Sequence, residues 1–249
     1  MSDKFFYYLS HLINGLPITI SLSLAGILSA CIISIGLSIL LISKRWYIIH
    51  PIRIFITVFT GTPLLVQLFL IYYGPAQFQV TRESSSLLWQ VFYYYNPTQC
   101  YILREFLHYL WQLLSYPWFC AYLALTLNSA AYTTLIFHGA LKAVPQGHWQ
   151  ACSALGMNRT QSLKVILPYA LKRALSSYSN EVIFVVKGTA LTSTITLMDV
   201  MGYNQFLNGQ YYDFTIFIAT GCIYILINGL LSIIMRLLEK KALAFENNQ

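Results

Sequence analysis

Charged residues are scarce in this sequence. Only 9% of the 249 residues are charged and 57% are hydrophobic, whereas about 25% of an average soluble domain is charged. So few charges argue against an ordinary soluble enzyme, and so many apolar residues exclude a disordered chain. The composition is typical of a protein that crosses a membrane several times.

Motifs of catalysis and metal binding are also missing. The five cysteines include no C-x-x-C pair, and the five histidines show no ligand spacing. The chain has no H-E-x-x-H helix, no nucleophile elbow and no phosphate-binding G-x-x-x-x-G-K-[ST] loop. We therefore expect no catalytic residue, no metal and no cofactor. Any process driven by ATP would need a separate ATPase.

Long apolar runs predict the membrane spans. A helix needs about 20 apolar residues to cross the hydrocarbon. From Phe5 to Ser43 the chain carries no Asp, Glu, Lys or Arg. The sequence predicts an all-α, polytopic helical bundle with about five spans, near residues 16–42, 54–73, 116–141, 182–201 and 214–235.

The basic residues predict the orientation of these spans. Eleven of the fifteen lie in three segments, which follow the first, third and fifth spans: Lys44, Arg45, Arg53, Lys142, Arg159, Lys164, Lys172, Arg173, Arg236, Lys240 and Lys241. Because cytoplasmic loops are enriched in Lys and Arg, this distribution puts the N-terminus outside and the C-terminus in the cytoplasm. The net charge of +7 is then a topology signal, and no nucleic-acid partner is needed to explain it.

We treat residues 1–249 as a single membrane domain, with a core at about 12–238 and two long connections. The outer connection, at about 74–115, is rich in Trp, Tyr and Phe. It is either an interfacial aromatic belt or a docking surface for an extracytoplasmic partner. The inner connection, at about 142–181, has helical periodicity.

The inner connection carries the most specific pattern in the chain. Small residues dominate a short predicted helix from Trp149 to Leu155, and Gly156 stands where a C-terminal glycine would end it. A second helical segment begins near Arg159 and is expected to end at Leu167 and Pro168. A helix with such a small face could lie in a groove of another protein, or it could be a plain cytoplasmic loop helix.

This pattern resembles the EAA loop of ABC importer membrane subunits. In that family an acidic-Ala-Ala triplet is followed by three residues, a Gly, nine residues and the ending I-x-L-P, whereas here Leu167 and Pro168 follow Ile166 directly. Here Gln150, Ala151 and Cys152 replace the triplet, Leu155 and Gly156 follow, and Ile166 precedes Leu167 and Pro168. The resemblance implies that this loop couples the membrane subunit to an ATP-hydrolysing subunit. Gln150 in place of the acid weakens the case for an ionic contact there.

The resemblance covers nearly the whole chain. The segments at residues 60–67, 127–132, 179–191 and 236–246 are similar to the permease subunits of polar amino acid ABC importers, the histidine and glutamine type, and most of all to arginine permeases. It implies a type I importer fold in the bacterial inner membrane and alternating-access transport of arginine, or else of lysine, ornithine, histidine or glutamine. The implied partners are a dimer of ATP-binding subunits, a second permease in a heterodimer, a periplasmic amino-acid-binding protein and membrane lipid.

One charge inside the fourth predicted span needs an explanation. An unpaired Lys187 would cost about 2.5–3.5 kcal/mol at the centre of a span. We expect Glu181, Lys187, Gly188 and Thr189 to line or border the substrate pathway. The alternative is that they form structural pairs at a subunit interface.

The third predicted span offers uncharged candidates for the pathway. Asn128 and Tyr132 lie one helical turn apart, whereas the acid that the family carries in this span is replaced by Leu135. The cation-binding charges could therefore lie in the partner permease. A self-contained carrier or channel is a weaker alternative, because the chain has no visible internal repeat and an odd number of predicted spans.

Overall fold

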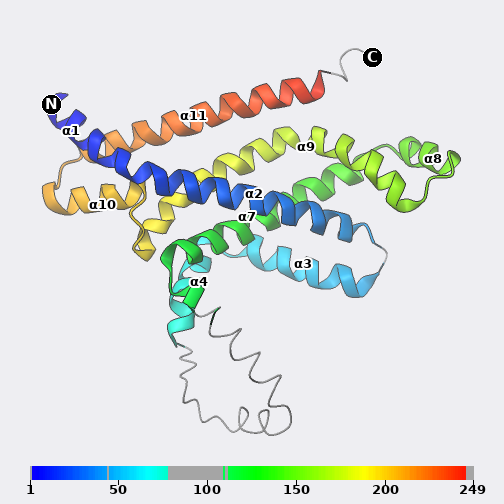
Figure 1. Cartoon of the computed structure of the whole chain (residues 1–249), viewed down its shortest axis with the longest axis horizontal. Coiled ribbons are helices and arrows are strands. Elements are labelled where there is room, and N and C mark those ends of the chain that lie inside the picture. The colour runs from blue at the N-terminus through cyan, green and yellow to red at the C-terminus, as the bar shows by residue number, and fades with distance from the viewer. Residues whose placement is uncertain (1, 44, 78–108, 110–111, 245–249) are drawn as a thin grey trace, which may run out of the picture.

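The computed structural model describes residues 2–43, 45–77, 109 and 112–244 (Figure 1). Every regular element in these residues is a helix, which confirms the predicted all-α class. Most of the predicted outer connection at 74–115 lies outside the described residues. The helices are α1 (Ser2–Leu12), the 3-10 helix η1 (Ile13–Gly15), α2 (Leu16–Leu41), α3 (Trp46–Gly61), α4 (Leu64–Gln77), α7 (Pro117–Lys142), α8 (Gln146–Ala154), α9 (Arg159–Gly188), η2 (Thr189–Ile195), α10 (Val200–Tyr211) and α11 (Thr215–Leu243).

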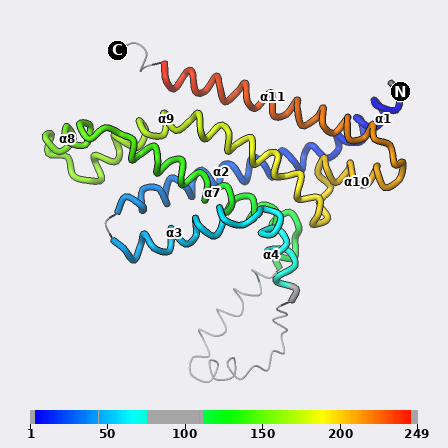
Figure 2. The backbone as a smooth tube through the Cα atoms, turned by 180° about the vertical axis from the view of Figure 1, so that it is seen from behind, coloured from blue at the N-terminus to red at the C-terminus, as the bar shows by residue number. Residues whose placement is uncertain are grey.

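The long helices α2, α7, α9 and α11 lie roughly along the longest axis of the molecule (Figures 1 and 2). Helix α7 packs against α2 and α9, and α11 packs against α9 and α1. The N-terminus, α10 and the start of α11 gather at one end. The turn between α2 and α3, the short helix α8 and the end of α11 gather at the other. The three predicted basic segments therefore meet at the α8 end.

Small side chains bring α2 and α7 together. The buried face of α2 includes Ser23, Gly26, Ala30 and Ser34, three or four residues apart, and α7 opposes it with buried alanines. A Cβ added to Gly26 would lie 3.7 Å from the Cβ of Leu125. Small residues of this kind let helix backbones approach closely in a membrane, where van der Waals contact drives association.

Three apolar clusters follow one another along the bundle. One joins α1, α10 and α11 around Leu12 and Ile216. A second joins α2, α4, α7 and η2 around Leu22 and Leu68. The third, around Ile166, joins α7, α8 and α9. The third cluster attaches the predicted coupling loop to the membrane-spanning body.

Three of the described helices are long and apolar enough to cross a membrane, and the number rises to five if two bent pairs each count as one span. Helices α2, α7 and α11 correspond to the spans predicted near 16–42, 116–141 and 214–235. The span predicted near 54–73 corresponds to a broken pair of helices, α3 and α4, which meet at a bend of 105°. Pro63 has no N–H to donate and disfavours a helical Thr62, whose backbone is extended.

The predicted helix end at Leu167 and Pro168 is wrong. Helix α9 runs for 30 residues with Pro168 in its interior. Ile166 and Ala170 are buried on either side of the proline, so packing offsets the lost backbone hydrogen bond. The span predicted at 182–201 is in turn the last part of α9 followed by η2, and this unit bends by 47° into α10.

Candidate functional site

The turn between α8 and α9 is built from two capping motifs. Gly156 has a φ of 70°, its N–H donates to the Ser153 carbonyl, and the Met157 N–H donates to the Cys152 carbonyl. This is the Schellman arrangement, and it confirms the predicted terminal glycine. Asn158 then caps α9: its Oδ1 accepts the Gln161 N–H at 2.9 Å, and the Gln161 side chain accepts the Asn158 N–H at 2.8 Å. The Asn-x-x-Gln spacing of this capping box was a signal that the sequence analysis did not use.

Helix α8 has one face against the body and one face free. Cys152 is buried in the third apolar cluster with Leu141 and Ile166. Gln150 and Ala151 are exposed, and Leu155 is 76% exposed at the end of the helix. The assignment of Cys152 to the coupling motif stays a prediction, and its buried side chain packs α8 against α7 and α9.

Two further residues of the predicted coupling motif have different positions. Leu167 is partly buried and packs against the third cluster, so it supports the position of α8. Pro168 is exposed on α9. The motif thus combines a free face on α8 with residues that hold this face in place.

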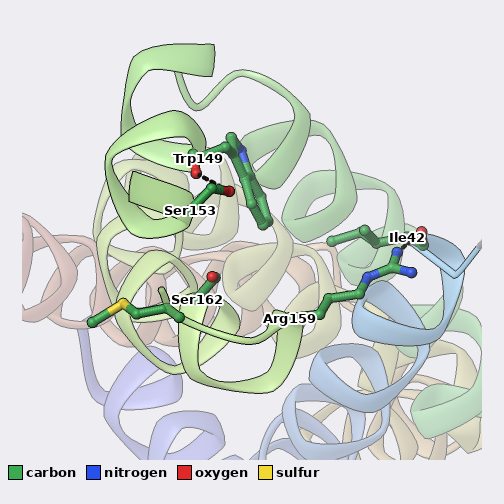
Figure 3. Close-up of a pocket in the computed structure, with 6 residues that line it drawn as sticks. Ile42, Trp149, Ser153, Arg159 and Ser162 are labelled. Carbon is green, nitrogen blue, oxygen red and sulfur yellow. Dashed lines mark hydrogen bonds between the residues drawn. The ribbon is translucent and has the colours of Figure 1, made fainter. Parts of the chain in front are cut away.

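A pocket of about 440 Å³ lies between α8, the start of α9 and the end of α2 (Figure 3). Trp149 and Ser153 line it from α8, and the Ser153 hydroxyl donates to the Trp149 carbonyl at 3.0 Å. Arg159 reaches across it and donates to the Ile42 carbonyl. A cation is favourable there because the last carbonyls of α2 carry partial negative charge. This contact ties the coupling turn to the end of α2.

The bend between α3 and α4 is held by one buried amide. Gln67 is 5% exposed, and its Nε2 donates to the carbonyls of Phe59 and Thr62, at 2.9 and 3.0 Å, and to the Thr62 hydroxyl at 2.8 Å. Backbone groups inside a membrane need a protein partner because no water is available. The sequence analysis did not single out Gln67 as the residue that holds this bend, although a lone amide in an apolar helix just after Thr62-Pro63 was a signal.

The two uncharged pathway candidates brace this same bend. The Asn128 Nδ2 donates to the Phe59 carbonyl at 3.2 Å and to the Gln67 Oε1 at 3.0 Å. The Tyr132 hydroxyl donates to the Thr60 carbonyl at 3.1 Å. The amide nitrogen of Asn128 is therefore already hydrogen-bonded to groups of this chain. Tyr132, with 39% of its surface exposed, keeps a free face.

The candidates on α9 do not share one face. Glu181 lies beside the hydroxyl of Ser129 on α7, and a Cβ on Gly188 would lie 3.1 Å from Leu64 and 3.2 Å from Leu125. Thr189 is 0% exposed, and its hydroxyl donates to the Val186 carbonyl at 2.7 Å. That Thr189 lines or borders a pathway stays a prediction; in the described structure its hydroxyl is used inside the helix packing.

Lys187 points away from this packing. It is exposed, and so are Arg173, Ser177, Asn180 and Phe184. The spacing of four, three, four and three residues places all five on one stripe of α9. We call these five residues the α9 stripe. The N-terminal part of the α9 stripe borders a groove of about 390 Å³ between α7 and α9. Arg173 and Ser177 line this groove from α9, and Leu135 and Gly139 line it from α7.

Contacts between α7 and α9 put the candidates in one layer of the bundle. The rings of Phe137 and Tyr178 lie 5.4 Å apart, and Gly188 meets Leu125. The stretch between these contacts includes Asn128, Tyr132, Glu181 and Lys187, and the α3–α4 bend joins it through Asn128. We call this the mid-membrane layer. Broken helices and polar side chains at such a depth mark substrate sites in many transporters.

The chain matches, over residues 23–243, the family described as the binding-protein-dependent transport system inner membrane component. It belongs to this family. It is therefore a membrane permease subunit of an ABC transporter and not an enzyme, and members of the family work with an ATPase and a binding protein.

Relatives match over almost their whole length. The arginine ABC transporter permease protein ArtM of Escherichia coli K12 is 50% identical over 241 residues, which are 97% of this chain and 98% of the relative. ArtM of Haemophilus influenzae is 49% identical over 240 residues, 96% of this chain and 95% of the relative. The octopine transport system permease protein OccM of Rhizobium radiobacter is 34% identical over 92% of this chain and 84% of the relative.

Solved structures agree with the family. A crystal structure of an amino acid ABC transporter with histidines superposes with a TM-score of 0.75 at 25% identity, over 95% of this chain and 96% of the other. The MetNI methionine ABC transporter, in an inward-facing conformation, superposes with a TM-score of 0.71 at 16% identity, over 97% and 99%. The second match supports the fold alone. Both bear out the predicted importer permease architecture.

Proposed function

We propose that this chain is the permease subunit of an ATP-driven importer of arginine in the bacterial inner membrane. The observation that carries the proposal is an identity of 49–50% to arginine permeases of two organisms over nearly the full length of each chain. The exposed tip of α8 agrees with it, because a permease without an ATP site needs a surface through which an ATPase acts.

In this proposal the α8 end of the bundle faces the cytoplasm. The three basic segments meet at that end (Figure 1), as the distribution of Lys and Arg around membrane spans requires. The N-terminus then lies outside. There a periplasmic binding protein delivers the amino acid to this subunit and a second, different permease.

The coupling surface in this proposal is the free face of α8. Ala151 and Leu155 are one turn apart, and both are exposed. They present a small residue and a large apolar residue to a groove of the ATPase dimer. Movement of the ATPase passes through α8 to α7 and α9, because Cys152 and Ile166 lie in the same buried cluster, and access to the mid-membrane layer alternates between the two sides.

The substrate is tested with the reconstituted complex of both permeases, the ATPase and the binding protein. ATP hydrolysis and uptake are measured across a panel of arginine, lysine, ornithine, histidine and glutamine. We expect arginine to give the strongest stimulation. A stronger response to another amino acid would replace arginine, and full transport by this chain alone in liposomes would overturn the proposal.

The coupling surface is tested at Leu155. We expect Leu155→Asp to lower arginine uptake at least about tenfold, as the loss of an apolar anchor does in other interfaces, while the complex keeps its amount in the membrane. Leu155→Met keeps an apolar side chain and serves as the matched control. Normal uptake by Leu155→Asp would show that α8 contacts the ATPase elsewhere.

A further inference from the structure

The groove between α7 and α9 has one apolar wall and one polar wall. Its volume is about 390 Å³, its α7 wall includes Leu135, Ile136 and Gly139, and Arg173 and Ser177 line it from α9. A Cβ added to Gly139 would meet no atom within 4 Å, so the groove is open at that point. A guanidinium and a hydroxyl therefore face an apolar surface.

Arg173 is held at the groove by a neighbour on its own helix. Its Nη1 donates to the Tyr169 hydroxyl at 3.0 Å, and its guanidinium carbon lies 5.7 Å from the centroid of the same ring. The Tyr169 ring lies 5.1 Å from the ring of His148 on α8. A guanidinium has five N–H donors, so the hydrogen bond with Tyr169 leaves donors for a ligand in the groove.

Both walls of the groove are free of acidic residues. Residues 106–180 include α7, α8 and most of α9, and they contain five Lys and Arg but no Asp or Glu: Lys142, Arg159, Lys164, Lys172 and Arg173. The next acid along α9, Glu181, lies beside Ser129 of α7 and about 12 Å further along the helix axis than Arg173. The groove therefore favours an anion.

The groove lies at the level of lipid headgroups. Contacts of Phe137 with Tyr178 and of Leu125 with Gly188 show that α7 and α9 run antiparallel, so Arg173 lies beside the last turn of α7. With 26 residues, α7 is about 39 Å long, whereas the hydrocarbon is about 30 Å thick. The end of α7 therefore reaches beyond the hydrocarbon, and the apolar wall leads from Arg173 back into it.

From these observations we infer that the groove binds an anionic phospholipid of the cytoplasmic leaflet. The lipid phosphate forms charge-assisted hydrogen bonds with the Arg173 guanidinium, close to Lys142, and an acyl chain lies along Leu135 and Gly139. Anionic lipids of this leaflet attract basic residues near its surface. The inference rests on the proposed function only for the side of the membrane on which α8 lies, and it is independent of which amino acid is carried.

The test compares two phospholipids with the same acyl chains, the anionic phosphatidylglycerol and the zwitterionic phosphatidylcholine. The complex of both permeases and the ATPase is purified in detergent and titrated with each lipid, and native mass spectrometry counts the lipids bound. We expect the wild-type complex to prefer phosphatidylglycerol. Arg173→Gln should weaken the tightest phosphatidylglycerol site by about tenfold or more, the usual loss for a hydrogen bond to a charged group, and Arg173→Lys should restore part of this affinity.

Two further variants locate the lipid. Gly139→Leu fills the open part of the groove and should remove one bound phosphatidylglycerol for each copy of this chain. Lys164→Gln removes a positive charge from an exposed position of the same helix, away from the groove, and should leave the affinity unchanged. Equal losses for Arg173→Gln and Lys164→Gln would overturn the inference, because the lipid would then respond to surface charge alone.

Two other occupants of the groove are separated by the same experiment. Displacement of phosphatidylglycerol by glycerol 3-phosphate, which has no acyl chains, would replace the lipid by a small anion. Unchanged lipid binding by Arg173→Gln together with weaker assembly of the two permeases would show that the second permease covers the groove. The proposed function fails by a different result, the absence of arginine uptake by the wild-type complex, and the lipid affinities stay measurable in that case.

Discussion

Helical structure is interrupted at the α8–α9 turn and at the α3–α4 bend. The backbone N–H and C=O groups that lose their helical partners find new hydrogen bonds in a different way at each place. Between α8 and α9 the hydrogen bonds join residues that are close in the sequence. Gly156 caps the end of α8, and Asn158 with Gln161 caps the start of α9. Between α3 and α4 the groups left by the bend are bound by Gln67 and by Asn128, which comes from another helix.

The difference follows from the solvent around each interruption. The α8–α9 turn is exposed, so water completes whatever the local motif leaves unpaired. The α3–α4 bend lies within the membrane layer, where an unpaired carbonyl costs several kcal/mol. A turn in water therefore needs only a local motif, whereas a bend in lipid needs side chains from distant parts of the fold.

The largest expected effect comes from removing the amide at the bend. Gln67→Leu keeps an apolar shape but removes the donor of the Thr62 carbonyl and one acceptor of the Asn128 amide, and it leaves the Phe59 carbonyl with Asn128 as its side-chain donor. At about 1–3 kcal/mol for each buried unsatisfied group, we expect a loss of about 3 kcal/mol or more, seen as a lower thermal unfolding temperature in detergent and a smaller yield of assembled complex.

The exposed neighbour of Gln67 provides the control for this prediction. Val66 is 45% exposed on α4, and Val66→Leu should unfold at the wild-type temperature. Wild-type stability of Gln67→Leu would remove the contrast between the two interruptions, because water would then be able to reach the bend.

A smaller effect is expected at the turn in water. Gly156→Ala places a Cβ on a residue with a φ of 70°, at a cost of about 1–2 kcal/mol. The change should increase hydrogen exchange in α8 while α3 and α4 keep their protection. Gly147→Ala, in α8 with open space around it, should be neutral or stabilising by up to about 1 kcal/mol. If the two alanine variants behaved alike, the capping role of Gly156 would be wrong.

The smallest effect is expected at the turn between α10 and α11. Hydrogen bonds from the Thr215 hydroxyl and N–H lower the pKa of Asp213. A carboxyl with a lowered pKa adds stability above its unfolded pKa of about 3.9 and loses it as the pH falls through the lower folded value. Proteolysis at this turn should therefore increase more on acidification in the wild type than in Asp213→Asn. A parallel increase in both would show that Asp213 does not stabilise the turn.

Much of this protein could be predicted from its sequence because the membrane acts on composition directly. Apolar length set the spans that became α2, α7 and α11, and the placement of Lys and Arg marked one end of the bundle. The motif around Gly156 could also be predicted, since its hydrogen bonds join residues that are close along the chain.

Other features depended on contacts between distant residues. The side chain of Cys152 faces the core only because α8 packs against Ile166 and Leu141. Thr189 is buried by packing of the same kind. Pro168 lies inside a helix because the packing of neighbouring side chains offsets its missing backbone hydrogen bond. Local sequence carries no information on which of these packings forms.

The sequence by itself determined that this chain crosses a membrane, which end of it is basic and which segment carries the coupling motif. Each of these follows from the solubility of a segment or from hydrogen bonds between near neighbours. Only the tertiary structure decided that the fourth and second predicted spans are bent, that Gln67 and Asn128 hold one bend, and that Lys187 faces outward from α9. The physical reason is that a backbone group or a charge in lipid must find its partner in another helix or in another molecule.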